Sequence, residues 1–210
     1  QNKFYTYSLS FRQPAEIIRD NALAISGLLN KEIGGPSVYP PQPEGLWAQV
    51  SHFGYPGSFT AQTFFPSFGK NRYRRSMYTA IKRTALNPSM AGFDAPTRET
   101  CSARRLTTNT PIQALVTLND PQFVEASEAF AKKIAASSKD LTGQIAFAFR
   151  QALARNPKKA EVKLLANAFH QQFRFYKKNK KLCGQDTPKQ AALNAMASII
   201  LNLSETLTRN

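Results

Sequence analysis

The sequence has little of the chemistry on which metalloproteins and disulfide-built scaffolds depend. It includes only two cysteines and two histidines, too few for a disulfide framework or a Cys/His zinc site. No Cys-x-x-Cys-His motif occurs, which excludes covalent haem attachment of that kind within this chain. No apolar run approaches the ~20 residues that a membrane-spanning helix needs. We therefore expect no metal, no haem and no membrane span in this chain.

No export signal is visible either, because the chain begins at Gln1 without a basic and then apolar leader. The opening residues look like continuing structure, so we expect the chain to be a piece of a longer protein. Hydrophobic residues make up 42% and charged residues 20%, a composition typical of a soluble globular domain. We expect residues 1–210 to form a single domain with a sizeable core.

Helical signals dominate both ends of the sequence. Pro14 precedes apolar residues spaced for one helical face, and Gly34-Gly35-Pro36 ends them. Later, capping side chains begin apolar stripes at Thr110-Pro111, Asp120-Pro121, Asp140 and Thr187-Pro188, and Asn156-Pro157 breaks the chain between two of these stripes. These signals predict a mostly α fold, an irregular helical bundle. We place its first helix within residues 1–33 and its main bundle over residues 110–210.

Residues 34–109 form an irregular segment between these helical parts. Its first half is rich in proline and glycine, which excludes a long helix or a central strand. That half also carries many aromatic residues: Tyr39, Trp47, Phe53, Tyr55, Phe59, Phe64, Phe65 and Phe68. Because a disordered linker would not hold so much aromatic area, we expect a long ordered loop packed onto the helices. Residues 74–83 fit either a helix or a strand, and we favour the helix.

The formal charge of +15 is concentrated in two segments. Residues 70–105 carry a net +7 and are rich in arginine, whereas residues 155–181 carry +8 and are rich in lysine. Arginine suits bidentate pairing and partial burial, and lysine suits a solvated helix face. Nucleic-acid binding would need the two segments to merge into one continuous stripe. No nucleic-acid motif accompanies them, so nucleic-acid binding stays a minor alternative.

The densest polar group lies between residues 93 and 119. Asp94 is one of two acids among nine basic residues, so we expect its carboxylate to stay ionised and to pair with guanidinium groups. One interpretation is an anion or carbohydrate site, and the other is a set of contacts that pins an irregular loop by saturating its backbone. The candidate binding residues are Trp47, Arg74, Arg75, Asp94, Arg98, Arg104, Arg105, Asn109 and Gln113.

Three residues in this region are weak catalytic candidates. Asp94 and Glu99 could serve glycoside hydrolysis, but arginine neighbours lower carboxyl pKa values, which is wrong for a general acid. Cys101 could become a nucleophile, yet both histidines lie far away in the sequence. A disulfide between Cys101 and Cys183 is possible and cannot be decided from sequence. We therefore leave enzymatic activity open and favour a non-catalytic role.

Several motifs, taken in order, resemble one family. They are Gly34-Gly35-Pro36-Ser37-Val38, Pro40 to Trp47, Tyr73-Arg74-Arg75-Ser76-Met77-Tyr78, Phe93-Asp94-Ala95-Pro96, Arg98-Glu99-Thr100-Cys101, Thr108 to Leu115 and Leu118 to Val124. Together they closely resemble the C-terminal domain of unknown function of planctomycete-type surface proteins, from about Arg19 to Arg209. Long motifs in register make this resemblance specific.

The resemblance implies an exported protein, in the periplasm or at the cell surface, whose family domain begins upstream of Gln1. It also implies a second planctomycete domain and often a cytochrome-c-like domain upstream, so any haem c belongs to a separate domain. No established activity or catalytic residue comes with the family.

Three hypotheses follow. The first is a non-catalytic binding or assembly module that contacts an upstream domain or an anionic surface polymer, in which Asp94 and Glu99 should both be bridged to arginine and largely buried. The second is a polysaccharide-active or redox-coupled enzyme domain, which requires Asp94 or Glu99 in an open cleft. The third is nucleic-acid binding through the basic segments.

Overall fold

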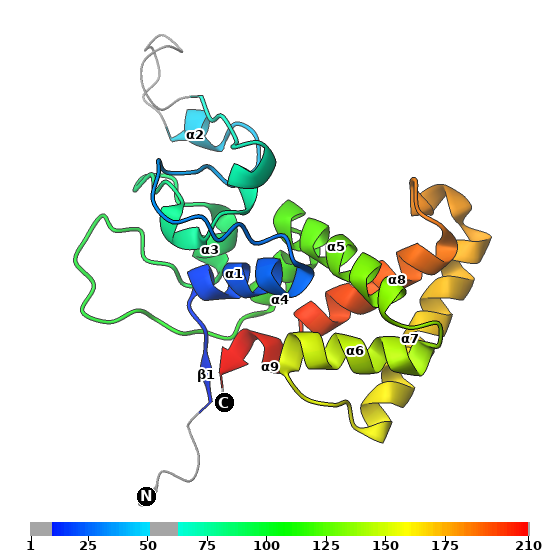
Figure 1. Ribbon diagram of the computed structural model, residues 1–210. Helices are drawn as coiled ribbons and strands as arrows, with labels where there is room; N and C mark the ends of the chain where they lie inside the picture. The colour runs from blue at the N-terminus through cyan, green and yellow to red at the C-terminus, as the bar shows by residue number, and fades with distance from the viewer. Residues whose placement is uncertain (1–9, 51–62, 210) are drawn as a thin grey trace, which may run out of the picture.

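The computed structural model describes residues 10–50 and 63–209, and over these residues the protein is mostly α-helical (Figure 1). Phe53, Tyr55 and Phe59 of the predicted aromatic loop, and also His52, lie outside the described residues. The elements in chain order are β1 (Phe11–Arg12), α1 (Ala15–Ser26), α2 (Leu46–Gln49), the 3-10 turns η1 (Gly69–Tyr73) and η2 (Ser76–Tyr78), α3 (Pro88–Gly92), α4 (Pro111–Asn119), α5 (Pro121–Ser137), α6 (Leu141–Leu153), α7 (Lys159–Lys178), η3 (Lys180–Cys183), α8 (Pro188–Leu201), α9 (Ser204–Leu207) and β2 (Thr208–Arg209).

The predicted capping residues begin α4, α5, α6 and α8 of the C-terminal half, whereas α7 begins after Lys158, which was not predicted as a cap. Thr110 precedes α4, the Asp120 side chain accepts a hydrogen bond from the backbone N–H of Gln122 at the start of α5, and Asp140 and Thr187 cap α6 and α8 in the same way. A proline occupies the first turn of α4, α5 and α8. Backbone N–H groups in the first turn have no acceptor within the helix, so proline, which lacks an N–H, costs no helical hydrogen bond there. The mostly α fold class is confirmed.

The first helix is shorter than predicted. Pro14 is the residue before α1 rather than its first residue, and the helix ends at Gly27, which has a left-handed backbone with φ 83°. Glycine adopts this conformation at no steric cost, so it ends helices readily. The earlier stop signal at Gly27 therefore overrides the one at Gly34.

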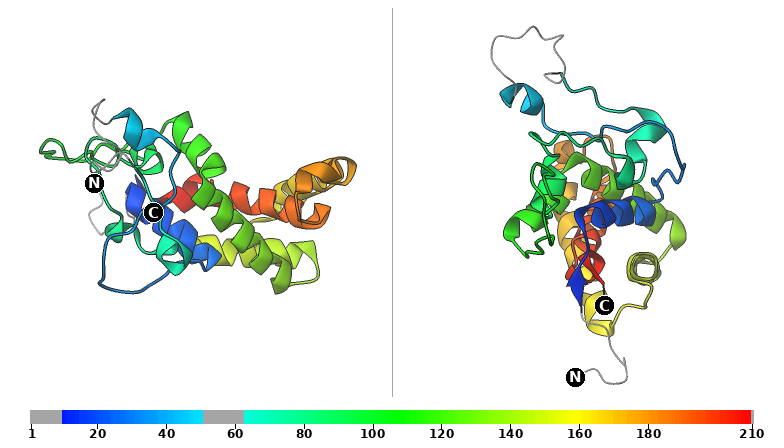
Figure 2. Two further views of the ribbon diagram at one scale, coloured as in Figure 1. Left: turned by 90° about the horizontal axis from the view of Figure 1, so that it is seen from above. Right: turned by 90° about the vertical axis from the view of Figure 1, so that its left-hand side faces the viewer.

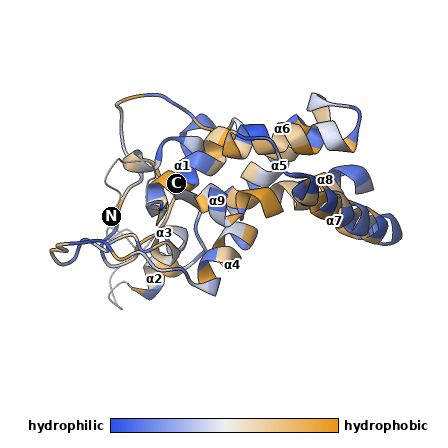
Figure 3. Ribbon diagram, turned by 90° about the horizontal axis from the view of Figure 1, so that it is seen from below, coloured by the Kyte–Doolittle hydropathy of each residue, from blue (hydrophilic) through white to orange (hydrophobic). Residues whose placement is uncertain are grey.

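One continuous apolar core joins the helices. α5 packs against both α1 and α8, and α7 packs against α8. Figure 2 shows these helices forming an elongated body, with α7 at the end opposite the irregular segment. Large fully buried side chains come from α1, α5, α6 and α8, among them Ile18, Leu23, Phe130, Ile134, Ile145, Phe149, Met196 and Ile200. α7 buries only Leu165 and Phe169, and hydrophilic and hydrophobic residues share its length in Figure 3.

The predicted helix over residues 74–83 is wrong. This stretch contains only the short turn η2 and then extends, because its backbone pairs with Val38 instead of with itself. The N–H of Val38 donates to the Tyr78 carbonyl oxygen at 2.8 Å, and the N–H of Ala80 donates to the Val38 carbonyl oxygen at 2.9 Å. Two distant parts of the irregular segment are thus joined by a parallel bridge.

Candidate binding face

A buried guanidinium on α1 ties the irregular segment to the helices. Arg19 is only 4% exposed, and it donates hydrogen bonds to Gln122 Oε1 at 2.5 Å and to the Arg74 carbonyl oxygen at 2.9 Å. Burial lowers the pKa of Arg19 to about 10, and the charge of Asp20, whose Oδ1 lies 3.5 Å away, opposes that shift. The predicted site residues did not include Arg19. Its only sequence signal is a charged residue on the buried side of an apolar helix.

Arg74, in the irregular segment, strengthens the same contact between that segment and α1, because its carbonyl oxygen accepts the hydrogen bond from Arg19. Its guanidinium stacks over the Tyr78 ring, 4.1 Å from the centroid, and donates to the carbonyl oxygens of Pro36, at 3.0 Å, and of Gly34. Arg74 is buried, so its donors serve the loop backbone, which needs such partners when it leaves water. Arg75 points the other way, with a side chain that is 47% exposed. Arg75 is therefore the more accessible of the two, although its Nε lies 3.9 Å from Asp20 Oδ2 in an ion pair.

Asp94 does not pair with arginine, which corrects the prediction made for it. Among the described residues it has no ion pair, and its carboxylate accepts hydrogen bonds from the Thr108 backbone N–H at 2.7 Å, the Thr108 hydroxyl at 2.8 Å and Gln113 Nε2 at 3.5 Å. Asn109 Oδ1 accepts a hydrogen bond from Arg12 at 2.5 Å. The bonds from Thr108 and Gln113 to Asp94 fasten together the two ends of the loop between α3 and α4, and the bond from Arg12 ties the loop to β1. Arg105, the one arginine of that loop with an ion pair among the described residues, pairs with Glu16 instead.

The loop itself, residues 97–110, is called the arginine loop below. Each of its residues is exposed, and it projects from the body between α3 and α4 (Figure 1). Arg105 pairs with Glu16 of α1 at 2.8 Å. Arg98 and Arg104 form no hydrogen bond or ion pair with any residue that the structure describes. The loop therefore presents two exposed guanidinium groups, and the positive charge of Arg98 also helps to lower the pKa of Glu16.

The catalytic candidates do not form a catalytic arrangement. Glu99 and Cys101 are exposed on the arginine loop, and the predicted pairing of Glu99 with arginine is wrong, since within the described residues it makes no ion pair. Cys101 and Cys183 are both free thiols, so they do not form a disulfide. His170 belongs to α7, at the far end of the body from the loop (Figure 1). Over residues 10–50 and 63–209, no cluster of three or more His, Cys, Asp or Glu side chains could hold a metal.

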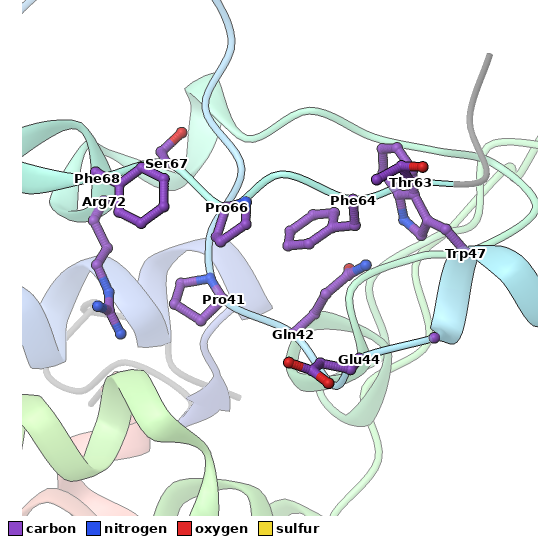
Figure 4. A pocket seen from close by; sticks show the side chains of 11 residues that line it. Pro41, Gln42, Glu44, Trp47, Thr63, Phe64, Pro66, Ser67, Phe68 and Arg72 are labelled. Atoms are coloured by element: carbon purple, nitrogen blue, oxygen red, sulfur yellow. The ribbon is translucent and has the colours of Figure 1, made fainter. Parts of the chain in front are cut away.

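The irregular segment also contains an aromatic pocket, which lies between α2 and η1. It has a volume of about 450 Å³, and Figure 4 shows Trp47 and Thr63 at one end and Phe68 and Arg72 at the other. The remaining wall is made by Pro41, Gln42, Glu44, Gly45, Phe64, Pro66 and Ser67. Of the residues predicted to bind a ligand, only Trp47 belongs to this pocket.

Trp47 is held by edge-to-face contacts with its neighbours. Its ring centroid lies 5.2 Å from that of Phe64 and 6.0 Å from that of Tyr39, and the Lys82 ammonium lies 4.6 Å from its ring. Burial lowers the pKa of Lys82. Phe65 and Phe68 are 73% and 78% exposed, so the expectation that the aromatic loop packs wholly onto the helices is wrong for these two residues.

The two basic segments lie apart. Residues 70–105 belong to the irregular segment and the arginine loop, whereas residues 155–181 lie on and around α7 at the opposite end of the body (Figures 1 and 2). They do not merge into the stripe that a nucleic-acid duplex would require. No helix among the described residues is long and apolar enough to cross a membrane.

These features define a mostly α-helical domain whose irregular segment carries an exposed arginine loop and an aromatic pocket. Over residues 1–169 the chain matches the family PSD1, described as a protein of unknown function (DUF1553), and it belongs to that family. The matched span contains all the motifs quoted above and ends within α7, short of Arg209. No curated protein and no solved structure matches the chain.

Proposed function

We propose that this chain is a non-catalytic binding and assembly module of an exported planctomycete protein associated with cytochrome c domains. The ordered set of motifs between Gly34 and Val124 supports that source and a location in the periplasm or at the cell surface. Any haem would belong to another domain, because this chain contains no Cys-x-x-Cys-His motif.

The ligand that fits the arginine loop best is an anionic surface polymer. The observation that carries this proposal is the pair Arg98 and Arg104, which have no partner among the described residues while most other arginines of the segment are used for structure. Guanidinium groups form strong charge-assisted hydrogen bonds with carboxylate and sulfate oxygens. A loop whose ends are fastened by Asp94 loses less conformational entropy on binding than a free tail would.

The placement of Asp94 and Glu99, the two carboxylates considered for catalysis, favours binding over turnover. A glycosidase needs two carboxyl groups that face each other across a cleft. Asp94 instead accepts hydrogen bonds from Thr108, and Glu99 is exposed on the loop. An acidic face of an upstream domain offers the same chemistry as an anionic polymer, and the experiment below uses the isolated chain to separate the two.

Binding to polygalacturonate, with uncharged dextran as the negative control, tests the proposal. We expect the double substitution Arg98→Ala and Arg104→Ala to weaken binding about tenfold at low salt and to lower the slope of log K against log salt by about 2. Biolayer interferometry over a range of salt concentrations measures both quantities.

The matched control is the double substitution Lys177→Ala and Lys178→Ala, which removes the same charge from exposed positions on α7. We expect it to weaken binding less than threefold. An equal loss in both double variants would show that net charge, rather than the loop, attracts the polymer. If the unaltered chain does not bind polygalacturonate, the proposed ligand is wrong, and an upstream domain becomes the better partner.

A further inference from the structure

An acid of the helical body reaches the arginine loop. Glu16 lies in the first turn of α1, and its Oε2 accepts a hydrogen bond from Arg105 Nη1 at 2.8 Å. Glu16 and Arg98 also line one cavity, which has a volume of about 210 Å³. The carboxylate therefore lies near two of the three arginines that the loop carries.

The ion pair of Glu16 and Arg105 holds the middle of the loop. The ends of the loop are fastened through Asp94 and Thr108. Between those ends, in residues 97–107, Arg105 makes the only hydrogen bond or ion pair to the rest of the chain that the structure describes. Each of these residues is exposed, so little buried apolar area adds to that hold.

Glu16 presents to the loop the same chemical group as the ligand proposed above. Partial burial raises the pKa of Glu16, but the hydrogen bond from Arg105 and the charges of Arg105 and Arg98 outweigh it and lower the pKa overall, so the group is ionised at neutral pH. The side chains of Arg105 and Glu16 are 43% and 23% exposed. A ligand can therefore reach the guanidinium, and solvent weakens the pair that it must replace.

We propose that Glu16 is an internal competitor of the anionic ligand. It holds Arg105 against α1 while the loop is empty, and a carboxylate of the polymer takes its place when the polymer binds. This inference rests on the function proposed for the arginine loop, and it adds Arg105 to Arg98 and Arg104 as a third ligand contact. Because one ion pair is exchanged for another, the third contact strengthens binding little, and Glu16 thereby limits the affinity of the loop.

Limited proteolysis with trypsin tests the hold on the loop without any polymer. Trypsin cleaves after arginine, and exposed loops are cut in proportion to the population that leaves its native contacts. We expect Glu16→Gln to raise the initial rate of cleavage after Arg105 about threefold. Cleavage after Lys163, within α7, reports global unfolding and should not change.

The matched control is Glu99→Gln, because Glu99 lies on the same loop and has no ion pair among the described residues. It should leave the rate of cleavage after Arg105 unchanged. If Glu16→Gln does not accelerate that cleavage, or if Glu99→Gln accelerates it equally, Glu16 does not hold the loop and the proposal is wrong.

Binding to polygalacturonate tests the exchange itself. We expect Glu16→Gln to raise the affinity about fivefold, because Arg105 then has no ion pair to give up. Arg105→Ala should lower the affinity about fivefold in the Glu16→Gln chain, but less than about twofold when Glu16 is present. Glu99→Gln changes the charge by the same amount, and its effect should simply add to that of Arg105→Ala.

These measurements separate an exchange of partners from a general effect of charge. Additive effects of Glu16→Gln and Arg105→Ala, or equal gains in affinity from Glu16→Gln and Glu99→Gln, would overturn the exchange. If the unaltered chain binds no polygalacturonate, the proposed ligand fails and the exchange fails with it. The hold of Glu16 on the loop would still be decided by the trypsin result, so the two failures are distinguishable.

Discussion

At the scale of single residues, Asp94 decides how the arginine loop is held. Its backbone is left-handed, with φ 60°, and its carboxylate accepts two hydrogen bonds from Thr108. Aspartate tolerates this conformation better than most residues. The residue thus shapes the loop by backbone geometry and side-chain bonding together.

We expect Asp94→Ala to lower the free energy of unfolding by about 1–2 kcal/mol, because the bonds to Thr108 are lost. Asp94→Gly should be about 1 kcal/mol less destabilising, since glycine removes the steric strain of a positive φ. Urea unfolding followed by circular dichroism measures both values. A midpoint that neither substitution shifts would show that the carboxylate does not hold the loop.

Sequence patterns locate Asp94 but not its partners. Its isolation among basic residues indicates an important carboxylate, yet formal charge cannot tell whether the nearest donors are guanidinium groups or a backbone N–H that the fold brings close. Arg19 shows the converse limit. It lies outside the basic segments, and its buried role depends on carbonyl groups from residues 72 and 74, which only the tertiary structure brings to it.

At the scale of elements, one arginine joins three parts of the C-terminal half. Arg155, between α6 and α7, pairs with Glu161 of α7 at 2.8 Å and with Glu205 of α9 at 2.6 Å. The hydrogen bond from Arg155 is the main cause that holds the pKa of Glu161 at about 2. A carboxyl group with a lowered pKa contributes stability above its ordinary pKa of 4.5, and that stability is lost as the pH falls through about 2.

Arg155→Ala should therefore lower the free energy of unfolding by roughly 1 kcal/mol at neutral pH, a modest value because solvent screens these pairs. The difference from the unaltered chain should shrink as the pH falls from about 4.5 to about 2. Arg150→Ala is the control, since that side chain bonds only Asn156 at 3.5 Å. Denaturant unfolding at a series of pH values measures the difference, and a pH-independent loss would contradict this account.

Elements with local signals are predictable and those with distant partners are not. The caps at Asp120, Asp140 and Thr187 are local, and each begins a helix as predicted. Met77 and Ile81 have the spacing of one helical face, but Val38 supplies backbone partners to Tyr78 and Ala80 from far along the chain. The aromatic pocket is likewise unpredictable, because it unites Gln42 and Arg72 across an irregular segment.

At the scale of the whole molecule, positive charge is divided between two ends. The arginine loop and the irregular segment occupy one end, and the lysines of α7 occupy the other (Figure 2). Composition gives the total charge, but only the fold shows this separation. A local binding site and a diffuse basic surface then make different predictions for where an anionic polymer contacts the chain.

Nuclear magnetic resonance titration of the isotope-labelled chain with galacturonic acid oligomers distinguishes these possibilities most directly. The account predicts that amide shifts concentrate in residues 97–110 and saturate with increasing oligomer concentration. Shifts centred on α7, or spread equally over both basic segments, would contradict it.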